Sequence, residues 1–176
     1  MNIKLIALDM DDTVLRTDKS LSERNSRTIK DAAKKGVYIV PATGRMVEMI
    51  PKEILNLGCV RYVLTSNGAS VIDLEENKVV YSNLMTKKET NYIVDFLSQY
   101  NLLFECFVGG KSYTDNKFLD KIKDFDYPQI YKDMLMKSQH FIKDMPNFIK
   151  NNKYGLEKIN LPYITGDINM ELREKL

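Results

Sequence analysis

The chain has 176 residues, of which 44% are hydrophobic and 28% are charged, a balance typical of a globular protein with a sizeable core. Its 26 Lys and Arg residues nearly cancel its 24 Asp and Glu residues, and the net charge of +2 argues against a nucleic-acid or membrane partner. The N-terminal apolar run is too short for a signal peptide, and no stretch approaches the roughly 20 apolar residues of a membrane span. We therefore expect a cytoplasmic protein.

The metal-binding and thiol residue types are scarce. Cys59 and Cys106 lie far apart without CxxC spacing, which argues against a zinc ribbon or a disulfide framework and suits a reducing cytoplasm. His140 is the only histidine, so a multi-histidine metal site is excluded, and its apolar neighbours favour a structural role. Any catalysis must rest on carboxylates, hydroxyls and backbone amides.

The first part of the chain alternates strands and helices. Residues 3–10 form a short apolar run that ends at acidic residues, which predicts a strand buried on both faces of a sheet. Ser20 and Glu23 have capping-box spacing, which predicts that a helix begins there. Strands are also predicted over residues 37–42 and 62–64, with a second helix between them. This order predicts a parallel α/β sheet with right-handed crossovers.

The pattern changes after the third strand. Residues 71–74 and 79–81 predict an antiparallel hairpin. Beyond residue 84 we expect helices over residues 89–100, 146–151 and 170–176, strands over residues 102–108, 140–142 and 156–161, and a polar turn after residue 108. We therefore expect two domains, residues 1–83 and 84–176.

Acidic residues follow the first strand directly. Asp9 and Asp11 stand two apart, so on an extended backbone their carboxylates point the same way while Met10 points away. Ligands of open α/β sheets lie at the carboxyl ends of the strands. Two such carboxylates suit Mg²⁺, and one of them could attack phosphorus to form an aspartyl-phosphate. Taken alone, the motif is more typical of a solvated acidic turn that caps a helix.

Polar clusters also follow the next two strands. Thr43, Gly44 and Arg45 come after the second strand, where a hydroxyl and backbone amides can bind phosphate oxygens. Asn67 and Gly68 come after the third strand. Each cluster is weak by itself, because Arg45 could begin a helix and Asn-Gly is a common turn. Three clusters on one edge of a parallel sheet together predict a phosphate site.

These motifs carry a family resemblance. LIALDMDDTVLRTDKSLS, followed by VPATGR and TSNGA, resembles the haloacid dehalogenase (HAD) superfamily, and more narrowly its Cof-type branch with a large α/β cap. The similarity is strong over residues 1–82 and looser in FIKDMPNFIKNN and YGLEKINLPYITGD. It implies a Rossmann-like parallel core over residues 1–83 and an inserted α+β cap over residues 84–176.

The resemblance also implies an activity and roles. It indicates a Mg²⁺-dependent phosphatase of small phosphorylated metabolites, such as sugar phosphates or phosphorylated cofactors. Asp9 would be the nucleophile and a metal ligand, and Asp11 would be the general acid and base and would bind the metal through its backbone carbonyl. Phosphate and substrate contacts are implied for Thr43, Gly44, Arg45 and Asn67.

The chain departs from the family pattern at two points. Asp12 stands where the family usually has glycine. The family also has a later lysine and an acidic GDxxxD or GDxxND motif, for which Asp167 in GDIN is a weak candidate and no pattern selects among Lys143, Lys150 and Lys153. We therefore expect the front part of a longer protein that ends inside the cap. Alone it would be weakly active or inactive and would associate through an incomplete sheet edge.

Other functions remain open at this stage. A phosphomutase or phosphotransferase would use the same intermediate on Asp9, and a catalytically dead fragment would bind phosphometabolites without turnover. A signalling receiver domain is disfavoured, because it carries its phosphoacceptor aspartate after the third strand, where this chain has Thr65, Ser66 and Asn67.

Overall fold

The computed structural model describes residues 3–126, 128–162, 172 and 174. The chain divides into two compact units, Met1–Asn83 and Leu84–Leu176. Asp167 lies outside the described residues, as does most of the helix expected over residues 170–176. In the part of the chain that is described, no helix is long and apolar enough to cross a membrane.

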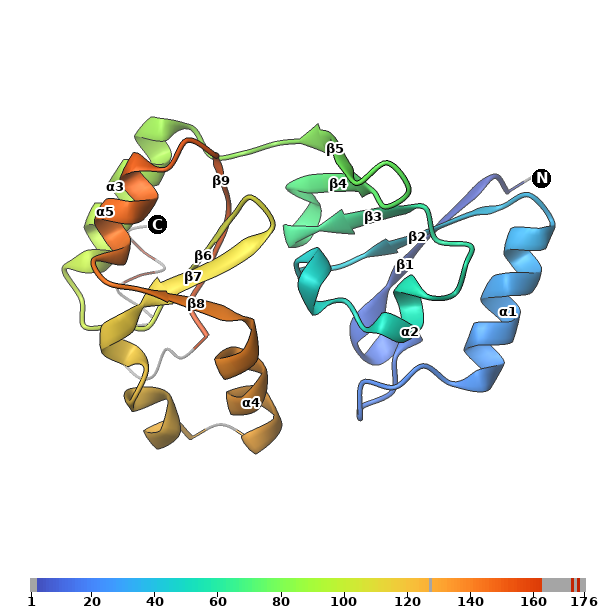
Figure 1. Cartoon of the computed structure of the whole chain (residues 1–176), viewed down its shortest axis with the longest axis horizontal. Coiled ribbons are helices and arrows are strands. Elements are labelled where there is room, and N and C mark those ends of the chain that lie inside the picture. The colour runs from blue at the N-terminus through green and yellow to red at the C-terminus, as the bar shows by residue number, and fades with distance from the viewer. Residues whose placement is uncertain (1–2, 127, 163–171, 173, 175–176) are drawn as a thin grey trace. The chain divides into compact units, whose positions relative to one another are not determined.

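The first unit contains a five-stranded sheet in the order β1-β2-β3-β4-β5 (Figure 1). The strands are β1 (Leu5–Asp9), β2 (Tyr38–Ala42), β3 (Tyr62–Thr65), β4 (Ser70–Asp73) and β5 (Lys78–Ser82). Strands β1, β2 and β3 are parallel, whereas β4 and β5 are antiparallel neighbours. The predicted parallel α/β core and the predicted hairpin are both confirmed.

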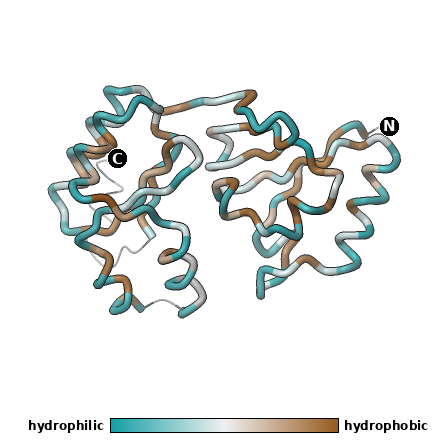
Figure 2. Tube along the Cα trace, viewed as in Figure 1, coloured by the Kyte–Doolittle hydropathy of each residue, from teal (hydrophilic) through white to brown (hydrophobic). Residues whose placement is uncertain are grey.

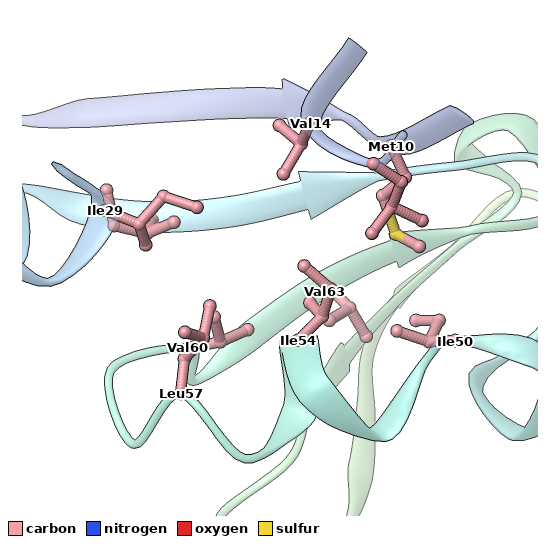
Figure 3. Close-up of a cluster of buried hydrophobic side chains, with 10 residues drawn as sticks. Met10, Val14, Ile29, Ile50, Ile54, Leu57, Val60 and Val63 are labelled. Carbon is pink, nitrogen blue, oxygen red and sulfur yellow. The ribbon is translucent and has the colours of Figure 1, made fainter. Parts of the chain in front are cut away.

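Helices α1 (Glu23–Lys34) and α2 (Lys52–Leu55) contribute to one apolar core of this unit. Figure 3 shows this cluster, in which side chains from the sheet, the helices and the loops meet. Its labelled members are Met10, Val14, Ile29, Ile50, Ile54, Leu57, Val60 and Val63. In Figure 2 hydrophobic stretches follow the strands, whereas α1 is largely hydrophilic, as expected of a helix that covers a core with one side only.

Strand β1 differs from the expectation of burial on both faces. Its side chains alternate: Ile6 and Leu8 pack against the core cluster, whereas Leu5 is 54% exposed. The prediction was wrong because α1 and α2 pack against a single face of β1. Among the described strands β1 pairs with β2 alone, which leaves its other edge unpaired. Self-association along that edge stays a prediction.

Helix α1 begins two residues later than expected. The hydroxyl of Ser22 accepts the backbone N–H of Asn25 at 3.1 Å, so Ser22 is the N-cap. Ser20 instead donates its hydroxyl to Asp18 at 2.6 Å, next to a bridge between Leu15 and Leu21. The predicted capping box at Ser20 was wrong because this pairing keeps the chain extended up to the N-cap.

The second unit contains a four-stranded sheet in the order β8-β7-β6-β9. Its elements in chain order are α3 (Lys87–Ser98), β6 (Glu105–Val108), β7 (Lys111–Asp115), α4 (Gln129–Ser138), β8 (Gln139–Ile142), α5 (Met145–Asn151) and β9 (Leu156–Asn160). Helices α3 and α5 lie side by side over one face of the sheet (Figure 1). Neighbouring residues of β8 serve separate cores, since Ile142 packs with α3 and α5 and Phe141 packs with Leu135 of α4.

The side chains of this unit fit a structural role for His140. The His140 ring packs 5.3 Å from the ring of Tyr113, and its Nδ1 lies 3.2 Å from the main-chain oxygen of Ser112. Strand β7 and helix α4 were not foreseen within the stretch after residue 108. That the second unit acts as a cap stays a prediction.

Candidate active site

The chain turns sharply where β1 ends. Asp9 is the last residue of β1, and Met10–Val14 forms a tight turn in which Asp11 and Asp12 have non-helical backbone angles. Met10 is 1% exposed and anchors the turn in the core, whereas Asp9 is exposed. The hydroxyl of Thr13 donates to Asp9 Oδ2 at 2.6 Å and lies 3.4 Å from the main-chain oxygen of Asp11. Thr13 thereby orients the Asp9 carboxylate and links the two acidic positions.

Asp12 has the least common backbone conformation in this turn. Its φ of 56° and ψ of 12° lie in the left-handed region, which glycine adopts freely and aspartate tolerates better than most residues. The departure from the family's glycine is therefore compatible with the turn. Asp12 supplies the same backbone path and adds a negative charge that is largely exposed.

Asp11 is held by two cations. Arg45 donates through Nε to Asp11 Oδ2 at 3.0 Å and through Nη2 to Asp11 Oδ1 at 2.5 Å. The Lys19 ammonium lies 3.1 Å from Asp11 Oδ1. Hydrogen bonding from Arg45 is the main cause that lowers the pKa of Asp11 below its usual value, and Lys19 adds to it against the opposing effect of burial. The carboxylate is therefore stabilised as an anion.

Backbone hydrogen bonds gather the ends of β2 and β3. The N–H of Thr43 donates to the carbonyl of Leu64 at 3.0 Å, and the N–H of Asn67 donates to the carbonyl of Thr43 at 3.1 Å. The N–H of Ser66 donates to the carbonyl of Arg45 at 3.0 Å, and the N–H of Arg45 donates to the Thr43 hydroxyl at 3.2 Å. Thr43 is 7% exposed. These hydrogen bonds join the two polar turns, the first of which contains Gly44.

Arg45 joins these two turns to the acidic turn. Besides its two hydrogen bonds to Asp11, it donates through Nη1 to the carbonyl of Met49 at 3.0 Å. The three predicted clusters, after β1, β2 and β3, therefore meet at one edge of the sheet.

The candidate lysines from the sequence are not part of the first unit. Lys143, Lys150 and Lys153 belong to the second unit, where Lys150 pairs with Asp95 at 2.6 Å. Thr13 and Lys19 were not predicted as functional residues from the sequence. Thr13 had a signal, because it is part of the DxDxT motif four residues after Asp9. Lys19 had none, since its approach to Asp11 depends on a turn ten residues from Asp9.

The oxygen atoms of the acidic turn fit a magnesium ion. Among the described residues no group of three or more Asp, Glu, His or Cys side chains could hold a metal. Mg²⁺ needs no such group, because it usually takes one or two carboxylates and completes its shell with water and phosphate. The Asp9 carboxylate and the main-chain carbonyl of Asp11 are hard oxygen donors of this kind. The Asp11 side chain is already bound by Arg45 and Lys19.

Comparison with known proteins identifies the family of this chain. A family profile described as haloacid dehalogenase-like hydrolase matches residues 6–171. A 5-amino-6-(5-phospho-D-ribitylamino)uracil phosphatase of Bacillus subtilis (strain 168), YcsE, is 27% identical over 171 residues, 90% of this chain and 68% of that protein. The phosphatase YwpJ of the same strain is 30% identical over 112 residues, 64% of this chain and 39% of that protein.

Solved structures agree on the fold. A haloacid dehalogenase-like hydrolase from B. subtilis superimposes with a TM-score of 0.76 at 22% identity, covering 98% of this chain and 66% of that one. The chain thus spans between 39% and 68% of the length of these three proteins. The profile covers nearly all of the chain, and the polar edge of the sheet carries Asp9, Thr43 and Asn67 of the three sequence motifs. The chain belongs to the haloacid dehalogenase-like hydrolases.

Proposed function

We propose that the chain is the catalytic portion of a Mg²⁺-dependent phosphatase that hydrolyses small phosphorylated metabolites through an aspartyl-phosphate on Asp9. The observation that carries this proposal is the exposed Asp9 carboxylate at the end of β1, hydrogen-bonded by Thr13 at 2.6 Å. A carboxylate in this position can attack phosphorus, because one oxygen is oriented by the hydroxyl while the side chain stays accessible. The relatives named as phosphatases support the same reaction class.

Asp11 is proposed as the general acid and base. In the first half-reaction it gives a proton to the leaving alcohol, and in the second it takes a proton from the water that attacks the aspartyl-phosphate. The structure holds Asp11 as an anion between Arg45 and Lys19, which is the form required for the second half-reaction. Acting as an acid requires Asp11 to loosen from the Arg45 guanidinium, so Arg45 sets how readily Asp11 is protonated.

The remaining residues are proposed to bind phosphate. The Thr43 hydroxyl and the Gly44 backbone amide would hold phosphate oxygens, and Arg45 and Asn67 would face the substrate. Mg²⁺ would be held by the Asp9 carboxylate and the Asp11 carbonyl, and when bound it supplies charge that offsets the anionic phosphoryl oxygens. The name of one relative, a phosphatase of a phosphorylated ribitylaminouracil, supports a small phosphorylated metabolite as the substrate class.

The proposal is tested by hydrolysis of p-nitrophenyl phosphate with and without Mg²⁺, comparing the parent chain with Asp9→Asn. Asp31→Asn is the matched control, because Asp31 is an exposed carboxylate of α1 paired with Lys34. We expect weak Mg²⁺-dependent turnover in the parent and the control and none in Asp9→Asn. Equal turnover in Asp9→Asn would overturn the assignment of the nucleophile.

Two alternatives give different outcomes in the same assay. Transfer of the phosphoryl group to an added sugar or alcohol in preference to water would identify a phosphotransferase or phosphomutase. Phosphate binding without turnover in the parent chain would identify a binding fragment.

A further inference from the structure

Lys19 has an unusual position for a lysine on a surface loop. Its ammonium lies 3.1 Å from Asp11 Oδ1 and 3.9 Å from Asp12 Oδ1, and its side chain is only 26% exposed. The side chain of Lys34, in an ordinary ion pair on α1, is 76% exposed. Lys19 therefore lies over the acidic turn instead of extending into solvent.

The backbone around Lys19 is built to hold that position. Lys19 has a φ of 65°, in the left-handed region, which costs a residue with a Cβ about 1 kcal/mol. Its N–H donates to the carbonyl of Arg16 at 2.8 Å, and the N–H of Arg16 donates to the carbonyl of Ser20 at 2.9 Å. The carboxylate of Asp18 accepts both the N–H and the hydroxyl of Ser20, at 2.9 and 2.6 Å. These bonds close a turn that returns the chain toward Asp11.

The charges of the site leave a role for a cation of this kind. Three carboxylates, Asp9, Asp11 and Asp12, stand within one turn, and a phosphate monoester would bring further negative charge to them. Arg45 is fixed by three hydrogen bonds, two to Asp11 and one to the carbonyl of Met49. The Lys19 ammonium is a point charge on a flexible stem, so it can move between a carboxylate and a phosphate oxygen without a change of backbone.

We propose that Lys19 contacts the phosphoryl group bound at Asp9 and neutralises its charge, a role for which the sequence pattern selects no lysine. This inference rests on the proposed function of Asp9, and it assigns the ligand of Lys19 by chemistry as a phosphate monoester or inorganic phosphate. A cation pre-positioned against developing negative charge is the kind of group whose removal costs about 10²–10³-fold in rate.

The test compares Lys19→Gln, Lys19→Arg and Lys34→Ala with the parent chain in two assays. Lys19→Gln keeps a polar hydrogen-bond donor but removes the charge, and Lys19→Arg keeps the charge. The first assay measures the Kd of inorganic phosphate by ³¹P NMR in the presence of Mg²⁺, and the second measures kcat and KM for p-nitrophenyl phosphate. Urea unfolding of each variant establishes that it is folded.

We expect Lys19→Gln to weaken phosphate binding about tenfold and to lower kcat about 10²-fold, because it loses a charged contact to the phosphoryl group. In Lys19→Arg the Kd of phosphate and kcat should be close to those of the parent, and in Lys34→Ala both should equal those of the parent. An unchanged Kd and kcat in folded Lys19→Gln would overturn the role of Lys19 and leave the proposed function standing.

The contact of Lys19 with phosphate can also hold where the proposed hydrolysis fails. A parent chain that binds phosphate but does not turn over, with binding lost in Lys19→Gln, would support the contact of Lys19 with phosphate and overturn the hydrolysis. A parent chain that does neither would overturn both.

Discussion

The contact between Arg45 and Asp11 can be measured directly by a double-mutant cycle with Arg45→Met and Asp11→Asn. Arg45 makes two hydrogen bonds to the Asp11 carboxylate, at 3.0 and 2.5 Å. An exposed ion pair contributes about 0–1 kcal/mol, and hydrogen bonds to charged groups contribute about 1.5–3 kcal/mol. The two side chains are 15% and 39% exposed, so solvent screens this pair in part. We expect a coupling energy of about 1–2 kcal/mol.

The coupling is obtained from urea unfolding of the parent, both single variants and the double variant. The pKa of Asp11 is lowered from its usual 3.8, chiefly by Arg45, so the stabilisation is complete above that value and is lost as the pH falls through the lower folded-state pKa. The coupling should therefore be the same at about pH 5 and pH 7 and shrink below about pH 4.

The exposed pair of Asp31 and Lys34 is the matched control, with side chains 55% and 76% exposed, and should give a coupling of about 0–0.5 kcal/mol. A coupling at Arg45 and Asp11 below about 0.3 kcal/mol would mean that the two side chains do not stabilise one another, since independent sites add within that margin.

Three further predictions concern the two cores and the open strand edge. Burial raises the pKa of Glu105 from its usual 4.5 despite hydrogen bonds from Gln139 and Asn160, so its charge lowers stability as the pH rises through the folded-state pKa. The free energy of unfolding, measured with urea, should then fall less between about pH 5 and pH 8 in Glu105→Gln than in the parent. An equal fall in the two proteins would contradict this. Met10→Ala, at a residue 1% exposed, should lower the free energy of unfolding by about 2–5 kcal/mol, and a loss typical of a surface site would show that Met10 does not anchor the turn. If a second copy pairs along β1, Leu5→Lys should abolish concentration-dependent association in sedimentation equilibrium, because Leu5 is 54% exposed there, and unchanged association would exclude this edge.

The parallel core and the meeting of three polar turns could be predicted from the sequence. Each of the first three strands is a short apolar run that ends abruptly in residues with special backbone or side-chain chemistry, such as Asp9, Thr43 and Asn67. In a parallel sheet these ends must lie at one edge, so the local pattern already determines the long-range arrangement. The hydrogen bonds among Thr43, Arg45 and Asn67 follow from that geometry.

One of the elements that were missed is a strand without an apolar run. Strand β7, with the sequence KSYTD, carries polar side chains at buried positions, where Ser112 donates to Gln139 at 2.7 Å and Thr114 donates to the carbonyl of Phe104 at 2.9 Å. Such a strand is stabilised by partners far along the chain, which a local hydrophobic pattern does not reveal. The same applies to Lys19, whose position 3.1 Å from Asp11 depends on a turn and not on its neighbours in sequence.

Asp12 allows a sharper test of the turn that carries the site. Because its φ of 56° is left-handed, Asp12→Ala should lower the free energy of unfolding by roughly 1 kcal/mol, as alanine has neither glycine's freedom nor the short polar side chain of aspartate. Asp12→Gly removes the steric cost but increases the conformational entropy of the unfolded chain. Its free energy of unfolding should be close to that of the parent and higher than that of Asp12→Ala. Urea unfolding of the three proteins gives this order. The alanine variant equalling or exceeding the glycine variant would mean that residue 12 does not adopt the left-handed conformation in solution.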